Sequence, residues 1–222
     1  MKKIKIEKIT SKGGYLDKIQ GTNKYYTFAE DYHDLDDAYF IEEKGQTYNG
    51  NSITIFEYPT KRQIYIKNKS HTYITDVIYQ DGLKYLEIDL KNKTLNIIEL
   101  DEITEKTKKI HTSTYKNLDE IAHIRLASDG SLVSEYLKNT EEIFKMYYPM
   151  EIEFKKEARE AFDLIDLIDE KLYFGNWYEN EEDGENGYEY YETIVVRNTK
   201  GEKIEEKRGS LIKMPNEEYW II

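Results

Sequence analysis

Acidic side chains crowd a late stretch of the chain together with aromatic rings. The stretch NWYENEEDGENGYEYYET, residues 176 to 193, carries seven carboxylates, four tyrosines and a tryptophan. Carboxylates can ligate hard cations, transfer protons or present an anionic surface to a partner. The spacing of the acids decides among these kinds of chemistry.

A calcium loop is the first kind of site to test. With Gly184 at the glycine position of an EF-hand loop, Glu179, Glu181 and Asp183 take the first ligand positions, but Tyr190 stands where a bidentate Glu is needed. We therefore predict no metal ligands here, with a looser oxygen-ligand site as an alternative. A block of like charge is typical of a solvated loop or of a surface that faces a partner.

A second acidic run surrounds a histidine. His33 lies among four aspartates, which are the residue types that a divalent metal accepts; they are Asp31, Asp34, Asp36 and Asp37. No second histidine stands at a coordinating interval. A polar surface turn explains the run without metal chemistry.

The remaining histidines are His71, His111 and His123. His111-Thr112-Ser113 resembles half of the two-histidine phosphoesterase signature, in which each His is followed two places on by Ser or Thr and flanks a phosphate. The other half is missing, because His71 is followed two places on by Tyr73. Strands could still bring His71 and His111 together.

Other catalytic and cofactor signatures are missing from the sequence. There is no cysteine, which excludes thiolate nucleophiles and cysteine-ligated metals, and no glycine-rich phosphate loop. Ser128-Asp129-Gly130-Ser131 has the composition of a hairpin turn. We predict no catalytic residues and no cofactor, and an enzyme is the less favoured interpretation.

Composition favours a β-rich protein. The 222 residues include 21 tyrosines and are only 39% hydrophobic, so much of the apolar area comes from rings with a polar tip. The first residues alternate Ile with Lys, which predicts a strand and not a secretory segment. No apolar run is long enough for a membrane helix, so we expect a soluble, cytoplasmic protein.

Charge is distributed unevenly along the chain. Residues 150 to 192 hold fifteen acidic and four basic residues, so this segment accounts for nearly all of the net charge of −12. Such a balance argues against binding to nucleic acid or to an anionic membrane.

Alternating and β-branched segments fill residues 52 to 115, with hairpin-length connectors at Gln80-Asp81-Gly82 and Lys91-Asn92-Lys93. This pattern predicts an antiparallel meander. Leu172 to Trp177 and Tyr190 to Val196 predict a further hairpin around the acidic stretch. Because the hairpins recur without a fixed period, we favour a sheet or open barrel over a propeller.

Helices are predicted in residues 139 to 170. Asn139 with Glu142 resembles a capping box that opens a short helix through Tyr147. Apolar residues at helical spacing then predict an amphipathic helix, namely Phe154, Ala158, Ala161, Phe162, Ile165 and Ile168. The expected fold is a single α+β domain, residues 1 to 222, of predominantly antiparallel β-sheet or open barrel with one or two helices in 139–170.

The leading functional hypothesis is a non-enzymatic acidic inhibitor, of the immunity-protein or phage anti-defence type, which docks a basic protein such as a nuclease or another nucleic-acid-binding protein. Its predicted partner-binding residues are Asp163, Asp166, Asp169, Trp177, Tyr178, Glu179, Glu181, Glu182, Asp183, Glu185 and Tyr188. Two alternatives remain. One is an enzyme whose site is assembled from scattered Asp, Glu, His and Tyr; the other is a carbohydrate- or peptide-binding β module built on an aromatic sheet face.

Overall fold

The computed structural model describes residues 15–29, 33–157, 161–180, 189–214 and 218–222. The chain divides into two compact units, Met1–Thr114 and Tyr115–Ile222, and each has a hydrophobic core of its own. The prediction of a single domain stays a prediction.

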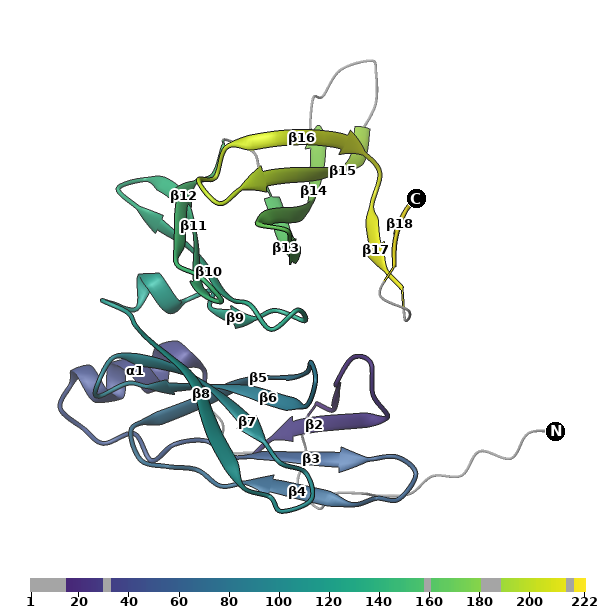
Figure 1. The fold of residues 1–222 in the computed structure, drawn as a ribbon. Coiled ribbons are helices and arrows are strands. Elements are labelled where there is room, and N and C mark those ends of the chain that lie inside the picture. The colour runs from purple at the N-terminus through teal and green to yellow at the C-terminus, as the bar shows by residue number, and fades with distance from the viewer. Residues whose placement is uncertain (1–14, 30–32, 158–160, 181–188, 215–217) are drawn as a thin grey trace. The chain divides into compact units, whose positions relative to one another are not determined.

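The first unit contains two four-stranded antiparallel sheets, each made of strands consecutive in the sequence (Figure 1). The strands of the first sheet are β1 (Asp17–Lys18), β2 (Lys24–Phe28), β3 (Ile53–Glu57) and β4 (Gln63–Ile66). Those of the second sheet are β5 (Thr72–Tyr79), β6 (Leu83–Asp89), β7 (Thr94–Leu100) and β8 (Thr107–Thr114).

The core of the first unit joins these two sheets. Alternation along β4 buries Ile64 and Ile66 and exposes Tyr65, as expected for a strand with one face in the core. The buried cluster is aliphatic apart from Tyr85, and it comprises Ile19, Ile53, Ile55, Ile64, Ile66, Ile74, Val77, Leu83, Tyr85, Ile98 and Leu100.

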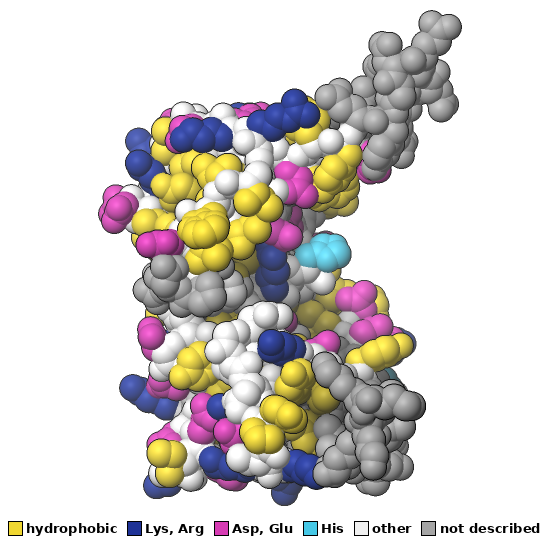
Figure 2. All heavy atoms as spheres, turned by 90° about the vertical axis from the view of Figure 1, so that its right-hand side faces the viewer, with side chains coloured by type: hydrophobic (Ala, Val, Ile, Leu, Met, Phe, Trp, Pro, Cys, Tyr) yellow, Lys and Arg dark blue, Asp and Glu magenta, His cyan; other side chains and the backbone are white. Residues whose placement is uncertain are grey.

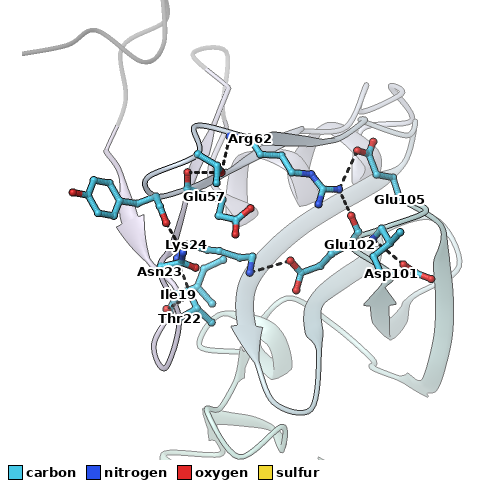
Figure 3. A network of polar contacts seen from close by, with 12 residues as sticks. Ile19, Thr22, Asn23, Lys24, Glu57, Arg62, Asp101, Glu102 and Glu105 are labelled. Carbon is cyan, nitrogen blue, oxygen red and sulfur yellow. Dashed lines mark hydrogen bonds and ion pairs between the residues drawn. The ribbon is translucent and has the colours of Figure 1, made fainter.

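Polar contacts also join the two sheets of the first unit (Figure 3). Lys24 of β2 pairs with Glu102 in the β7–β8 connection, with Nζ 3.0 Å from Oε2. Arg62 donates to the Glu102 carbonyl and lies 3.7 Å from Glu105. Asp101 accepts hydrogen bonds from the Thr104 and Ile103 amides, which lowers the pKa of its carboxyl and orders the turn.

The second unit contains two more four-stranded antiparallel sheets and a terminal hairpin. The third sheet has β9 (Arg125–Leu126), β10 (Leu132–Lys138), β11 (Glu141–Tyr148) and β12 (Ile152–Lys155), and the short 3₁₀ helix η1 (Asp119–Ile121) precedes it. The fourth sheet has β13 (Ala161–Ile168), β14 (Lys171–Asn180), β15 (Glu189–Asn198) and β16 (Lys203–Arg208); β17 (Leu211–Lys213) and β18 (Tyr219–Ile221) form the hairpin.

An aromatic cluster holds the third and fourth sheets together. Phe144 lies with its ring centroid 5.1 Å from Phe154 and 5.2 Å from Phe174, the latter edge to face. Phe144 and Phe174 are fully buried, and aliphatic side chains from both sheets surround them. Edge-to-face rings add to the hydrophobic gain from burial.

The sheets are four consecutive four-stranded meanders, two in each unit, and more than half of the described residues lie in strands. The prediction of a mostly antiparallel β fold is therefore confirmed. The sheets begin at Asp17, Thr72, Arg125 and Ala161, so their spacing is irregular. This irregularity is the reason that the sequence favoured a barrel over a propeller.

The helices predicted in residues 139 to 170 are wrong. Asn139 and Thr140 form the turn between β10 and β11, with positive φ angles of 52° and 68°. Phe154 belongs to β12, while Ile165 and Ile168 belong to β13. The apolar residues of these two strands recur in the sequence at intervals that imitate a helix. A bulge between Leu164 and Asp166 shifts the register of β13, which allows a strand to carry this spacing.

The single α-helix among the described residues overlaps the acidic run around His33, where the sequence suggested a polar surface turn. Helix α1 (Leu35–Glu43) begins at Asp34, whose side chain accepts a hydrogen bond from the Asp37 amide at 3.1 Å. The negative charges of Asp36 and Asp37 in its first turn interact favourably with the positive end of the helix dipole and stabilise the helix. The acidic run therefore has a structural role at a helix N-terminus.

Candidate ligand-binding pocket

A surface cavity of about 420 Å³ opens beside the third sheet of the second unit. Its residues come from η1 and the segment after it, from the β10–β11 hairpin and from the end of β12. They are Asp119, Ala122, His123, Glu135, Tyr136, Leu137, Glu142 and Lys156. We call this cavity the main pocket.

Strand register sets the position of the pocket residues. In the β10–β11 ladder Leu137 lies opposite Glu142, and Glu135 lies opposite Phe144. Residues opposite each other share a face, so Glu135 and Glu142 both stand on the side of the sheet that carries Phe144. The Lys156 amide donates to the Glu142 carbonyl at 2.8 Å, which places the lysine on the same side.

The floor of the main pocket is an ion pair. Lys156 has a side chain only 7% exposed, and its Nζ lies 2.5 Å from Glu135 Oε2 and 3.5 Å from Glu142 Oε2. Glu135 also lies 3.7 Å from Arg125. These contacts fix the carboxylate of Glu135 and leave the more exposed Glu142 at the rim.

A second hollow of about 260 Å³ adjoins the main pocket. Its lining residues are Lys116, Asn117, Asp119, Glu120, Tyr136, Leu137, Lys138 and Asn139. Asp119, Tyr136 and Leu137 line both cavities. We call this one the side hollow.

Buried charges lie beneath the side hollow. Glu120 is buried; its carboxylate accepts from the Lys116 amide at 3.0 Å and lies 3.9 Å from Lys145, whose side chain is also buried. Burial and the nearby carboxylates of Glu153 and Glu120 raise the pKa of Tyr136 to about 12. The phenol therefore stays protonated and can donate at neutral pH.

The charge of the main pocket limits its ligands. Its lining holds three carboxylates but a single lysine, and that lysine is already paired with Glu135. Phosphates and other anions would be repelled. The rim instead offers acceptors from Asp119 and Glu142 and an imidazole from His123, a set suited to hydroxyl or amino groups.

The predicted partner-binding residues do not share one face. Trp177 and Tyr178 are neighbours on β14, so their side chains point to opposite faces of the fourth sheet. Tyr178 stacks on Tyr191 with centroids 5.0 Å apart and donates to Glu206 at 3.1 Å. Trp177 is 46% exposed, and Glu179 is exposed on the Trp177 face.

The three aspartates of the predicted docking face also differ in environment. Asp163 is exposed but paired with Arg125 at 2.9 Å. Asp166 is buried and accepts a hydrogen bond from the Tyr219 hydroxyl. Asp169 is exposed in the turn before β14. The other predicted residues lie outside the described residues: Glu181, Glu182, Asp183, Glu185 and Tyr188.

The histidines are not brought together as the sequence allowed. His71 precedes β5 and His111 lies on β8, so β6 and β7 separate them in the second sheet. The His71 Nδ1 atom contacts Glu42 of α1 at 2.9 Å, and His111 Nε2 contacts Ser113 at 2.5 Å. Within the described ranges, no three metal-ligating side chains gather closely enough to hold an ion.

The serine-containing turn behaves as its composition predicts. The Asp129 side chain accepts from the Ser131 amide at 2.9 Å and from the Ser131 hydroxyl at 2.7 Å. Ser131 is buried in the turn before β10 and does not line the main pocket.

Sequence reasoning missed the pocket residues. The capping-box pattern predicts a helix cap at Glu142, and the sequence patterns considered predict neither Glu135 nor Lys156 as a site residue. One available signal was the strict alternation of Ile152 and Phe154 with Glu153 and Lys155, which indicates a strand whose next inward position is Lys156. A lysine at an inward position predicts a carboxylate partner.

Hydrophobic side chains also reach the surface of the second unit. Ile212 on β17 and Trp220 and Ile221 on β18 are exposed. Figure 2 shows one face of the molecule, on which hydrophobic side chains gather in clusters between charged ones. In the described part of the chain, no helix is both long and apolar enough to cross a membrane.

Comparison with known proteins gives a resemblance of fold only. No family model matches the chain, and no curated protein matches it. Among solved structures, it is similar to the β-propeller domain of the Trilobed protease from Pyrococcus furiosus, with 15% identity and a TM-score of 0.42 over 90% of this chain and 60% of that one. It is also similar to dipeptidyl peptidase 4 of Porphyromonas gingivalis, with 12% identity and a TM-score of 0.39 over 73% of this chain and 24% of that one.

These comparisons correct the leading functional hypothesis. The similar chains are peptidase chains, one of them a β-propeller domain, and not acidic inhibitors of the immunity type. The burial of Asp166 and the pairing of Asp163 agree with this correction. The chain spans only 60% and 24% of the two structures, and at these TM-scores their activities imply nothing for it. A basic protein partner and the eleven docking residues stay untested predictions.

Proposed function

We propose that the chain is a β module that binds a carbohydrate in the main pocket. The observation that supports this proposal is the pocket itself: about 420 Å³, with carboxylates and an imidazole at the rim and a fixed ion pair at the floor. Its volume lies within the range of small-molecule sites, roughly 300–1,000 Å³.

Charge favours a sugar over a phosphorylated ligand. Carboxylates that accept from neutral hydroxyl groups form charge-assisted hydrogen bonds, each contributing about 1.5–3 kcal/mol. Asp119 and Glu142 are placed to accept, and His123 can donate or accept. Ala122 and Leu137 supply apolar surface for the C–H faces of a sugar ring.

The ordered ion pair at the floor of the main pocket favours affinity. Lys156 Nζ lies 2.5 Å from Glu135 Oε2, so contacts within the protein already order these two side chains. Less conformational entropy is then lost, and more of the interaction energy appears as affinity.

The test is a titration of the purified chain with neutral monosaccharides and disaccharides. Binding is measured by NMR chemical-shift changes and by calorimetry. The matched variants are Glu142→Gln and Glu141→Gln. These neighbours carry the same charge, but only Glu142 lines the pocket, while Glu141 pairs with Lys155 at 2.8 Å.

We expect Glu142→Gln to weaken sugar binding about tenfold, equivalent to about 1.4 kcal/mol, and Glu141→Gln to leave it unchanged. Sugar phosphates should bind more weakly than the parent sugars. If no sugar in the panel shifts the resonances of the pocket residues, the carbohydrate proposal is wrong.

A further inference from the structure

The main pocket and the side hollow share lining residues. Asp119, Tyr136 and Leu137 line both cavities, so the cavities adjoin at these three residues, which we call the ridge. All three residues belong to the second unit, on η1 and β10. A ligand that fills the main pocket can therefore extend past this ridge.

The two cavities differ in chemistry. The main pocket has an excess of carboxylates, whereas the side hollow has two lysines and two asparagines beside two acids. Its donors are Lys116, Lys138, Asn117 and Asn139. One cavity mainly accepts hydrogen bonds and the other mainly donates them.

Two donors of the side hollow are held by contacts within the protein. Lys138 is the last residue of β10 and pairs with Glu153 of β12 at 3.0 Å, with half of its side chain exposed. Asn117 donates to Asp119, which lies on the shared ridge. These contacts orient the Lys138 and Asn117 side chains.

We propose that the main pocket and the side hollow are adjoining subsites for an oligosaccharide of at least two sugar units. This inference rests on the proposed carbohydrate binding and adds the length of the ligand and its second subsite. One unit lies in the main pocket against Glu142 and His123. The next unit crosses the ridge at Leu137 and accepts hydrogen bonds from Lys138.

The test compares one monosaccharide with its disaccharides of different linkage, using calorimetry on the full chain. The paired variants are Lys138→Met and Lys155→Met. Both lysines are at least half exposed and paired with a glutamate, but Lys155 lines neither cavity.

We expect the best disaccharide to bind at least tenfold more tightly than the monosaccharide. Lys138→Met should remove most of that gain without changing monosaccharide affinity, and Lys155→Met should change neither value. Equal affinities for the two ligands, or an equal loss for both in Lys138→Met, would overturn the second subsite while carbohydrate binding stands. Failure of every sugar to bind would overturn both proposals.

Discussion

Lys156 and Glu135 form a close ion pair across the third sheet, with Nζ 2.5 Å from Oε2 and the lysine side chain 7% exposed. Lys156 follows β12 and Glu135 lies on β10, with β11 between them in the sheet. The pair therefore reaches over a whole strand, beside the aromatic cluster of Phe144 and Phe154.

Loss of the buried ammonium should destabilise the second unit. We expect Lys156→Met to lower the free energy of unfolding by about 3 kcal/mol, because Glu135 would keep its charge in a partly buried site. The neighbouring Lys155→Met removes an exposed pair and should cost less than about 1 kcal/mol. Urea unfolding at pH 7 measures both; equal midpoints would show that the buried pair contributes nothing.

The aromatic cluster should carry much of the stability of the second unit. Phe174→Ala removes a fully buried ring that contacts Phe144, and we expect a loss of about 3–5 kcal/mol. Ile204→Ala removes a half-exposed side chain of β16 and should stay within about 1 kcal/mol. Both tryptophans, Trp177 and Trp220, belong to this unit, so tryptophan fluorescence follows its unfolding alone. A small loss for Phe174→Ala would contradict the assigned core.

Two glycines of the first unit separate backbone strain from a steric clash. Gly45 and Gly50 both have positive φ, 73° and 82°, but a Cβ at Gly50 would lie 2.2 Å from the Lys69 carbonyl oxygen, whereas one at Gly45 meets nothing within 4 Å. Gly45→Ala should cost about 1–2 kcal/mol for its left-handed conformation. Gly50→Ala should cost clearly more, because backbone must move. Circular dichroism during thermal unfolding would show the difference, and equal melting temperatures would argue against the close approach.

Acid should weaken one carboxylate contact of the third sheet. The hydrogen bond from Lys138 holds the pKa of Glu153 below its usual value. A lowered folded-state pKa stabilises the protein above the unfolded-state pKa, and this contribution is lost as pH falls through the folded-state value. Glu153→Gln should therefore be less stable than the parent at pH 7, and the difference should vanish on titration toward pH 3. A difference that persists at pH 3 would point to another role for Glu153.

Local turn chemistry made much of the β structure predictable. Gln80-Asp81-Gly82 and Lys91-Asn92-Lys93 do connect β5 to β6 and β6 to β7, because Gly82, Asp81 and Lys93 adopt the positive φ angles that such turns need. The predicted hairpin of β14 and β15 is also confirmed. In these cases the residues that determine the turn are close neighbours in the sequence.

The helices and the pocket depend on distant contacts. Asn139 and Glu142 have the spacing of a capping box, but the chain pairs Leu137 with Glu142 in a hairpin instead. Burial of Phe144 and Met146 on one face of that hairpin outweighs the local helical signal. Glu135, Glu142 and Lys156 meet only through this register, so the alternation before Lys156 predicts a carboxylate partner but does not say which carboxylate it is.

Every described four-stranded sheet consists of strands that follow one another directly in the sequence. Among the described strands, no backbone ladder crosses the connection between β8 and β9, where the two units divide. Each meander can therefore close by short-range steps as the chain emerges during synthesis, without waiting for a distant partner strand. Cleavage at that connection would leave each of these described ladders with both of its strands.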